Sequence, residues 1–310
     1  MLRAAAVTLT LAAGAAVTPS GFPNSLAFDR PPRGWRSWSA FASAVNQTLI
    51  ESVMDAMVKK RAGSVSLADL GYTDVGLDAG WQACGAGVNG SYHSGTTGHV
   101  IVDDKFPDMR AMTDHAHRLG LTASWYLNAD GCESQSNLSH TYYTNDSDDA
   151  VHKFNYDGVK FDSQMHGPDH NISRWAAALN ATGKAVMIEN CLDKHPQYLL
   201  KDPEYCPFNF YRSGGDNGPS FHGGMWNMLG NQLPFLEVTS PVPASRPGCW
   251  AYMDMLSIGA PQWGSGLQKQ AAARGCPPMT LQEEASLFAG WAITSSPLIL
   301  SFDVVNDTGE

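Results

Sequence analysis

The strongest constraint on the fold is an alternation of short apolar runs with amphipathic stretches, which continues along almost the whole chain. Such runs predict buried strands, and the stretches between them predict the helices that connect parallel strands. The predicted strands are 35–41, 74–77, 121–127, 158–161, 185–188 and 297–302, and the predicted helices are 48–60, 107–119, 171–179 and 281–292. The helix at 48–60 is expected to begin with a capping box at 48–51. Counting such segments along the chain gives about eight strands. Together with a length of 310 residues, this predicts a single α/β domain, a (β/α)8 TIM barrel.

Composition narrows the class of partner. Hydrophobic residues make up 43% of the chain and charged residues 16%, which is typical of a folded globular protein. The formal net charge of −10 argues against binding to nucleic acid or to anionic membrane. The 9 Trp, 10 Tyr and 12 Phe suit a neutral, polyhydroxylated small molecule. The oligomeric state is left open.

The first residues are typical of a secretory signal peptide. Arg3 gives a charged start, an apolar run begins at Ala4, and small residues at 13–15 offer a cleavage site. A membrane anchor is the alternative, but the run is shorter than a bilayer-spanning helix needs, and no later segment is long enough either. We therefore predict a signal peptide at 1–20 and a mature barrel domain at 21–310.

Cysteines and sequons agree with export. The six cysteines are even in number and form no CxxC pair, which favours disulfides, and pairing in sequence order gives 84–132, 191–206 and 249–276. Sequons begin at Asn46, Asn89, Asn137, Asn145, Asn171, Asn180 and Asn306. The expected location is outside the cell or in the secretory-pathway lumen, including lysosome or vacuole.

Acidic residues follow several predicted strands. Lys160 and Asp162 share one face of their strand, because alternate residues of a strand point to the same side. Asp78, Asp216 and Asp254 also follow strand-like segments. Each could be a structural ion pair or a turn residue, but together they predict one pocket at the carboxyl ends of the strands.

Motifs for other chemistries are missing from the sequence. His115 and His117 are two residues apart on a predicted helix and diverge, so they cannot form a metal pair. The chain contains no GxSxG, HExxH or P-loop motif. No metal or organic cofactor is expected.

A series of motifs then occurs in a fixed order. They are GWRSW at 34–38, GW at 80–81, FP at 106–107, HRLGL at 117–121, KFD at 160–162, R-x3-D at 212–216, GCW at 248–250, DM at 254–255, WAI at 291–293 and PL at 297–298. In this series the chain resembles glycoside hydrolase family 27, the melibiase-type α-galactosidases, from about Arg33 to Asp303. The resemblance covers nearly the whole predicted mature chain.

The resemblance implies a retaining glycoside hydrolase that releases terminal α-galactosyl residues. Asp162 would be the nucleophile and Asp216 the general acid/base, with the two carboxyl groups about 5–5.5 Å apart. Lys160 would favour the ionised form of Asp162, and partial burial would keep Asp216 protonated. The implied sugar-binding residues are Trp38, Asp78, Tyr126, Lys160, Arg212 and Asp254.

The chain also departs from the family pattern. Ala79 replaces the second aspartate of a paired motif, Ser163 replaces a cysteine, and WAYMD at 250–254 replaces WNDPD. The segment at 189–191 does not align cleanly with the family, and the sequence runs out soon after the eighth strand. We expect a barrel truncated there, without an eighth helix or the family's C-terminal β-sandwich, and with Leu298 and Leu300 exposed on one side.

These departures leave the sugar open. The alternatives are an α-N-acetylgalactosaminidase, a β-L-arabinopyranosidase or a glucan-acting relative, each by the same mechanism. A non-catalytic carbohydrate-binding barrel is the alternative from another class.

Overall fold

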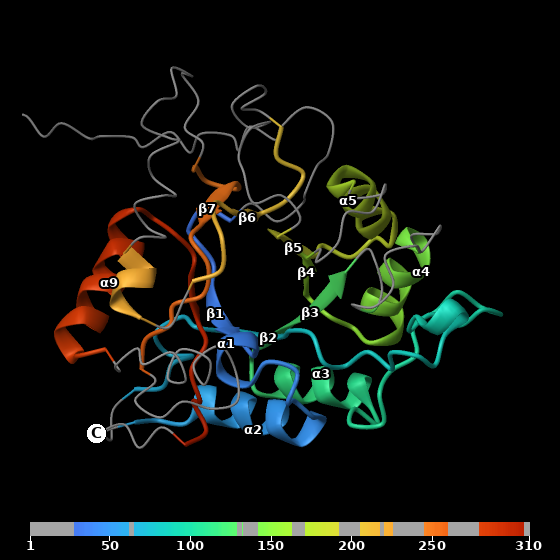
Figure 1. The fold of residues 1–310 in the computed structure, drawn as a ribbon. Helices are drawn as coiled ribbons and strands as arrows, with labels where there is room; N and C mark the ends of the chain where they lie inside the picture. Colours follow the sequence, from blue (N-terminus) through green and yellow to red (C-terminus); the bar gives the residue numbers. More distant parts are fainter. Residues whose placement is uncertain are drawn as a thin grey trace, which may run out of the picture.

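The computed structural model describes residues 28–61, 65–128, 132, 142–162, 171–191, 205–217, 220–225, 245–259 and 279–306. Eight parallel strands form one curled sheet in the order β7-β6-β5-β4-β3-β2-β1-β8 (Figure 1). The strands are β1 (Arg33–Arg36), β2 (Asp74–Leu77), β3 (Thr122–Asn128), β4 (Gly158–Asp162), β5 (Met187–Cys191), β6 (Phe210–Arg212), β7 (Trp250–Tyr252) and β8 (Leu298–Leu300).

The sheet curls back on itself. Beyond β7, Leu256 forms a parallel bridge with Leu300 of β8, and the Leu256 amide donates to the Ile299 carbonyl at 2.8 Å. With β8 already paired to β1, this bridge joins the two ends of the sheet. The predicted (β/α)8 barrel is confirmed.

Several helices in the described part of the chain flank the sheet. They are α1 (Trp38–Phe41), α2 (Gln47–Val58), α3 (Met109–Arg118), α4 (Tyr143–Asp148), α5 (Ile172–Ala181) and α9 (Leu281–Ile293), with short helices η1 (Val88–Gly90) and η2 (Asp149–Lys153). Helices α2 and α3 lie side by side, as do α4 and α5 (Figure 1). Among the described residues, none of the helices is long and apolar enough to cross a membrane.

Two predicted boundaries were wrong at the start of the chain. The predicted strand at 35–41 is not one strand, because the chain turns after Arg36 and the Phe41 amide donates to the Ser37 carbonyl at 2.9 Å to form α1. Helix α2 has its N-cap at Asn46, whose side chain accepts from the Leu49 amide, instead of a capping box at Thr48. A capping box does open α9, between Thr280 and Glu283.

The last strand is better covered than expected. Leu300 is only 5% exposed and belongs to the main core with Phe302 and Val304, and Leu298 is partly buried against the same core. The expectation that both leucines lie exposed was therefore wrong, because the strand packs against the main core.

One of the three predicted disulfides is confirmed. Cys84 bonds to Cys132, whereas Cys206 bonds to Cys249, so the predicted 191–206 and 249–276 pairs were wrong. Cys191 is a buried free thiol, and Cys276 lies outside the described residues. Cys191 ends β5 facing the barrel interior, where it meets Arg212 instead of the loop that carries Cys206.

Candidate active site

The inward face of the strands is lined with charged side chains. Arg36 on β1 binds Glu189 on β5 at 3.1 Å, although these strands are not neighbours in the sheet. Lys160 on β4 likewise reaches Asp78 beyond β2 at 2.7 Å. Contacts between distant strands must cross the barrel interior, so Arg36, Lys160 and Glu189 point inward.

Strand register places four inward-facing residues in one row: Asp162, Cys191, Arg212 and Tyr252. Asp162 of β4 lies opposite Cys191 of β5, and Arg212 of β6 lies opposite Tyr252 of β7. Arg212 joins the two halves, because its Nη1 donates to the Cys191 Sγ at 3.4 Å. We call Lys160, Asp162, Glu189, Cys191, Arg212 and Tyr252 the inner wall. Its upper row lies at the carboxyl ends of the strands, where active sites of such barrels are found.

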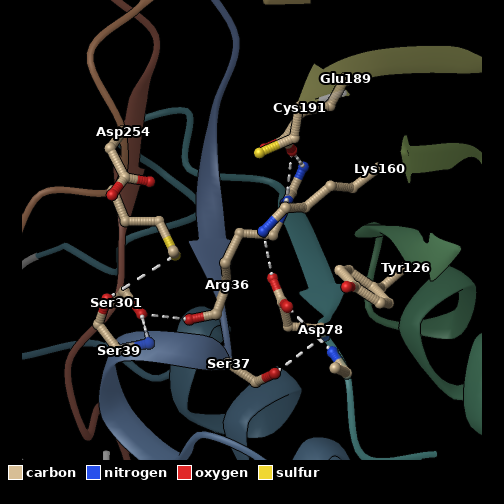
Figure 2. Close-up of polar contacts among 12 residues, drawn as sticks. Arg36, Ser37, Ser39, Asp78, Tyr126, Lys160, Glu189, Cys191, Asp254 and Ser301 are labelled. Carbon is tan, nitrogen blue, oxygen red and sulfur yellow. Dashed lines mark hydrogen bonds and ion pairs between the residues drawn. The ribbon is translucent and has the colours of Figure 1, made fainter. Parts of the chain in front are cut away.

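On one side of the mouth, Lys160 and Asp78 form a buried ion pair, and the Lys160 ammonium lies 5.5 Å from the centroid of the Tyr126 ring (Figure 2). The Ser37 hydroxyl accepts from the Asp78 amide at 2.9 Å and so ties this carboxylate to the end of β1. Burial alone would lower the pKa of Lys160, but Asp78 and neighbouring acidic groups raise it well above its usual value. Lys160 is therefore a fixed cation.

On the other side, Arg212 binds two carboxylates. Its Nη1 lies 3.0 Å from Asp254 and its Nη2 lies 3.2 Å from Asp216. Asp254 also accepts from the Asn217 amide and has a φ of 86°, an unusual value for a residue with a side chain. Burial raises the pKa of Asp254, while Arg212 acts in the opposite direction.

Asp162 and Asp216 differ in their surroundings. Asp162 ends β4 and is partly buried, and its charge helps to raise the pKa of Tyr126 and of Cys191, after the larger effect of burial on each. The Asp216 side chain is 61% exposed, so the expectation that burial keeps it protonated was wrong. The Lys160 ammonium makes a short contact with Asp78, and Asp162 is among the acidic groups that raise the pKa of Lys160.

Trp38 completes the predicted set. It lies in α1, directly after β1, and packs against a cluster of inward-facing apolar residues. That cluster comprises Met187, Phe210, Trp250, Tyr252, Met255 and Ile299. All eight predicted residues thus lie on or just beyond the carboxyl ends of β1 to β4, β6 and β7.

Below the mouth, sequence reasoning missed a buried ionic cluster. Arg36 binds Asp74 as well as Glu189, and all three side chains are at most 7% exposed. Gly76 leaves room for this cluster, because a Cβ there would lie 2.3 Å from the Arg36 Cδ. Strand alternation extended past 188 would have placed Glu189 and Cys191 on the inward face.

One described group could bind a metal ion, and it lies apart from the inner wall. His99, Asp148 and Asp149 bring ligand atoms within 4.8 Å of one another. Asp149 already accepts from the Val100 amide at 2.9 Å and contacts His99 at 3.0 Å. Neither Asp162 nor Asp216 belongs to this group.

Comparison with known sequences supports the resemblance seen in the motifs. No family model matches the chain. It is 26% identical to α-galactosidase 3 of Arabidopsis thaliana over 90% of this chain and 56% of that protein. It is also 26% identical to the α-galactosidase of Lachancea cidri, over 88% of this chain and 57% of that protein. The chain thus spans a little over half the length of these relatives.

Solved structures share the fold. α-Galactosidase I from Mortierella vinacea superposes with a TM-score of 0.68 at 23% identity, over 93% of this chain and 70% of that one. A family 27 β-L-arabinopyranosidase from Geobacillus stearothermophilus also gives 0.68, at 16% identity over 91% and 73%. The resemblance to the melibiase-type α-galactosidases is confirmed in sequence and in fold.

Proposed function

We propose that the chain is a glycoside hydrolase that releases terminal α-galactosyl residues with retention of configuration. The observation that carries the proposal is the inner-wall row itself. Asp162 lies beside Cys191, Cys191 contacts Arg212, and Arg212 binds Asp216, so the two candidate catalytic carboxylates belong to one connected cluster at the barrel mouth. Relatives named α-galactosidases over most of the chain support the choice of sugar.

The chemistry would proceed in two displacements. In the first, the Asp162 carboxylate attacks the anomeric carbon while Asp216 protonates the glycosidic oxygen, so the aglycone leaves as an alcohol. In the second, Asp216 removes a proton from water, the water oxygen attacks the anomeric carbon, and the bond to Asp162 breaks. Each step inverts the anomeric carbon, so the product retains its configuration.

The remaining polar groups would bind the sugar. The Lys160–Asp78 and Arg212–Asp254 pairs offer donors and acceptors whose positions are held by their own ion pairs. Tyr126 and Trp38 add aromatic surfaces, which suit the apolar faces of a sugar ring. The Asp216 side chain is 61% exposed, so an alcohol and then water can reach its carboxyl group.

The proposed setting is the secretory route. Residues 1–20 would act as the signal peptide, and the disulfides Cys84–Cys132 and Cys206–Cys249 suit an oxidising compartment. Domain 21–310 would then be the exported catalytic barrel.

A hydrolysis screen tests the proposal. The nitrophenyl glycosides would be α-galactoside, α-N-acetylgalactosaminide, β-L-arabinopyranoside and α-glucoside. We expect the α-galactoside to be hydrolysed fastest, with the first-formed galactose in the α configuration by NMR. A faster rate on another glycoside would contradict the assigned sugar, and β-galactose as first product would contradict retention. Sugar binding without hydrolysis of any of them would favour the carbohydrate-binding barrel.

A further inference from the structure

Tyr252 is a member of the inner wall that the proposed mechanism leaves unused. It lies opposite Arg212 in the register of β6 and β7, and its ring packs in the inward-facing apolar cluster. The side chain is fully buried, yet its hydroxyl has no hydrogen-bond partner among the described residues. A buried polar group in this state calls for a physical explanation.

The unpaired hydroxyl costs free energy. A buried donor without a partner destabilises a fold by about 1–3 kcal/mol, so phenylalanine would be the more stable choice for packing alone. The ring itself is well held. The ring packs edge to face on Phe210, with 5.3 Å between the ring centroids. The backbone is held as well, because the Tyr252 carbonyl accepts from the Ser213 amide at 2.9 Å and from the Ser213 hydroxyl at 3.1 Å.

Its charged surroundings determine what the hydroxyl can offer. Burial raises the pKa of Tyr252 well above its usual value, and the carboxylates of Glu189 and Asp254 raise it further against the opposing effect of Arg36 and Lys160. The phenol therefore keeps its proton and can donate it in a hydrogen bond. Two of these neighbours, Lys160 and Asp254, are proposed sugar-binding residues, so the Tyr252 ring lies near the proposed sugar site.

Burial does not separate Tyr252 from those groups. Lys160 is 4% exposed, and Asp78, Arg212 and Asp254 are each 2% exposed. All of the fixed polar groups of the mouth are thus as deeply placed as Tyr252, and each of the other four is already engaged in an ion pair. Together with the Arg212 Nε–H, the Tyr252 hydroxyl is a buried donor in this set without a hydrogen-bond partner among the described residues, and it is the neutral one.

We propose that Tyr252 is a further substrate-binding residue, whose phenol O–H donates a hydrogen bond to a ring hydroxyl of the bound sugar. Tyrosine stands here where the resembling motif has an aspartate, and Ala79 stands where another aspartate is expected. A neutral donor thus stands where the motif has an acceptor. The inference rests on the proposed function, because it needs a sugar bound in this mouth.

The test is Tyr252→Phe, which deletes one oxygen and keeps the ring. Tyr156→Phe is a matched control, since the Tyr156 hydroxyl is also buried and unpaired but its ring stacks on Trp125 in the outer core. For nitrophenyl α-galactoside we expect Tyr252→Phe to raise KM by about threefold to tenfold, the range for loss of one neutral hydrogen bond. The melting temperature should stay level or rise in both variants, and KM should not change in Tyr156→Phe.

Galactose binding by calorimetry separates the two proposals. If wild type hydrolyses the glycoside and Tyr252→Phe has an unchanged KM and an unchanged galactose Kd, the binding role is overturned and the function stands. If wild type binds galactose without hydrolysing any glycoside, and Tyr252→Phe binds it more weakly, the binding role stands without the function. A lower melting temperature with an unchanged Kd would assign the hydroxyl to the fold, and absence of both binding and hydrolysis in wild type would overturn both proposals.

Discussion

The inward and outward faces of the barrel strands carry opposite kinds of side chain. On β4, Lys160 and Asp162 belong to the inner wall, whereas Val159 and Phe161 point outward and are buried in the main core. Phe161 stacks on Trp175 of α5 at 4.5 Å between ring centroids. We call Val159, Phe161 and Trp175 the outer wall of this strand.

The two walls contribute differently to the protein. Burying the aromatic outer wall stabilises the fold directly, because apolar surface leaves water. Burying the ions of the inner wall brings little net stability, since the desolvation cost offsets much of the attraction. Residues that are costly to the fold and gathered at one end of the strands are therefore the better candidates for function. The predictions below test that division, beginning with the largest effect.

The largest effect is expected at Asp162. Asp162→Gly should lower hydrolysis of nitrophenyl α-galactoside by at least about ten-thousandfold, because the nucleophile is lost. Azide should restore turnover by direct displacement and give the inverted glycosyl azide. Asp216→Ala should still form the glycosyl-enzyme from this activated substrate and then stall, and azide should give the retained product. Steady-state rates and NMR of the azide products measure this.

Phe161→Leu is the matched control, since it changes the adjacent outward residue of the same strand. It should lower stability and keep activity at temperatures where the protein is folded. Swapped azide products between the Asp162 and Asp216 variants would reverse the two roles. Full activity in Asp162→Gly would break the proposed division between the walls.

The next effect concerns stability alone. Trp175 is fully buried and contacts Phe161 and, at 4.6 Å, Tyr143. Trp175→Ala should reduce the free energy of unfolding by about 3–5 kcal/mol, through lost burial and the cavity left behind. Urea unfolding measures the loss. The free energy of unfolding of Asp162→Gly is measured alongside. If Trp175→Ala lost no more stability than Asp162→Gly, the view that stability resides in the outer wall would be contradicted.

The predictability of these walls from sequence follows the same division. Strand 74–77 was predicted at its observed bounds, because the apolar residues Val75 and Leu77 alternate with Asp74 and Gly76, and such alternation is a local signal. Alternation also identified the shared face of Lys160 and Asp162. It failed at 35–41, where a segment of mixed apolar and polar residues contains a turn after Arg36, since a short pattern does not separate a strand from a short helix.

Long-range contacts of the site were beyond local signals. The predicted strand 185–188 stopped one residue before Glu189, so its pairing with Arg36 across the barrel was missed. Disulfide pairing in sequence order failed for Cys191 and Cys206, because connectivity depends on which face each cysteine occupies. The exposure of Asp216 likewise depends on a loop conformation that composition does not encode.

A smaller effect is expected at Gly76, on the inward side of β2. Gly76→Ala would place a Cβ 2.3 Å from the Arg36 Cδ, and relief requires this buried arginine to move away from Asp74 and Glu189. We expect a loss of about 1–3 kcal/mol, as for other overpacked sites. Arg36→Asn should cost less in the alanine background than in wild type, which a double-mutant cycle measures. Additive costs would mean that the glycine does not serve to accommodate Arg36.

The smallest effect is a pH dependence at Glu189, whose sign is the test. Burial raises the pKa of Glu189 above its ordinary value of 4.5, with Asp78 acting in the same direction and with Arg36, Lys160 and Arg212 opposing it. The folded protein therefore holds this proton to higher pH than the unfolded chain, and its contribution to stability is lost as pH rises through the folded pKa. Glutamine cannot ionise, so the melting temperature of Glu189→Gln relative to wild type should shift in favour of the variant as pH rises from about 4 towards 7. Asp114 is a control of opposite sign, because burial opposes but hydrogen bonding to Arg110 and its charge lower the Asp114 pKa, so Asp114→Asn should shift against the variant as pH rises from about 2 towards 4. If the melting temperature of Glu189→Gln instead fell relative to wild type as pH rose, Arg36 and the cations of the inner wall would outweigh burial, and the cluster beneath the mouth would stabilise the fold as the outer wall does.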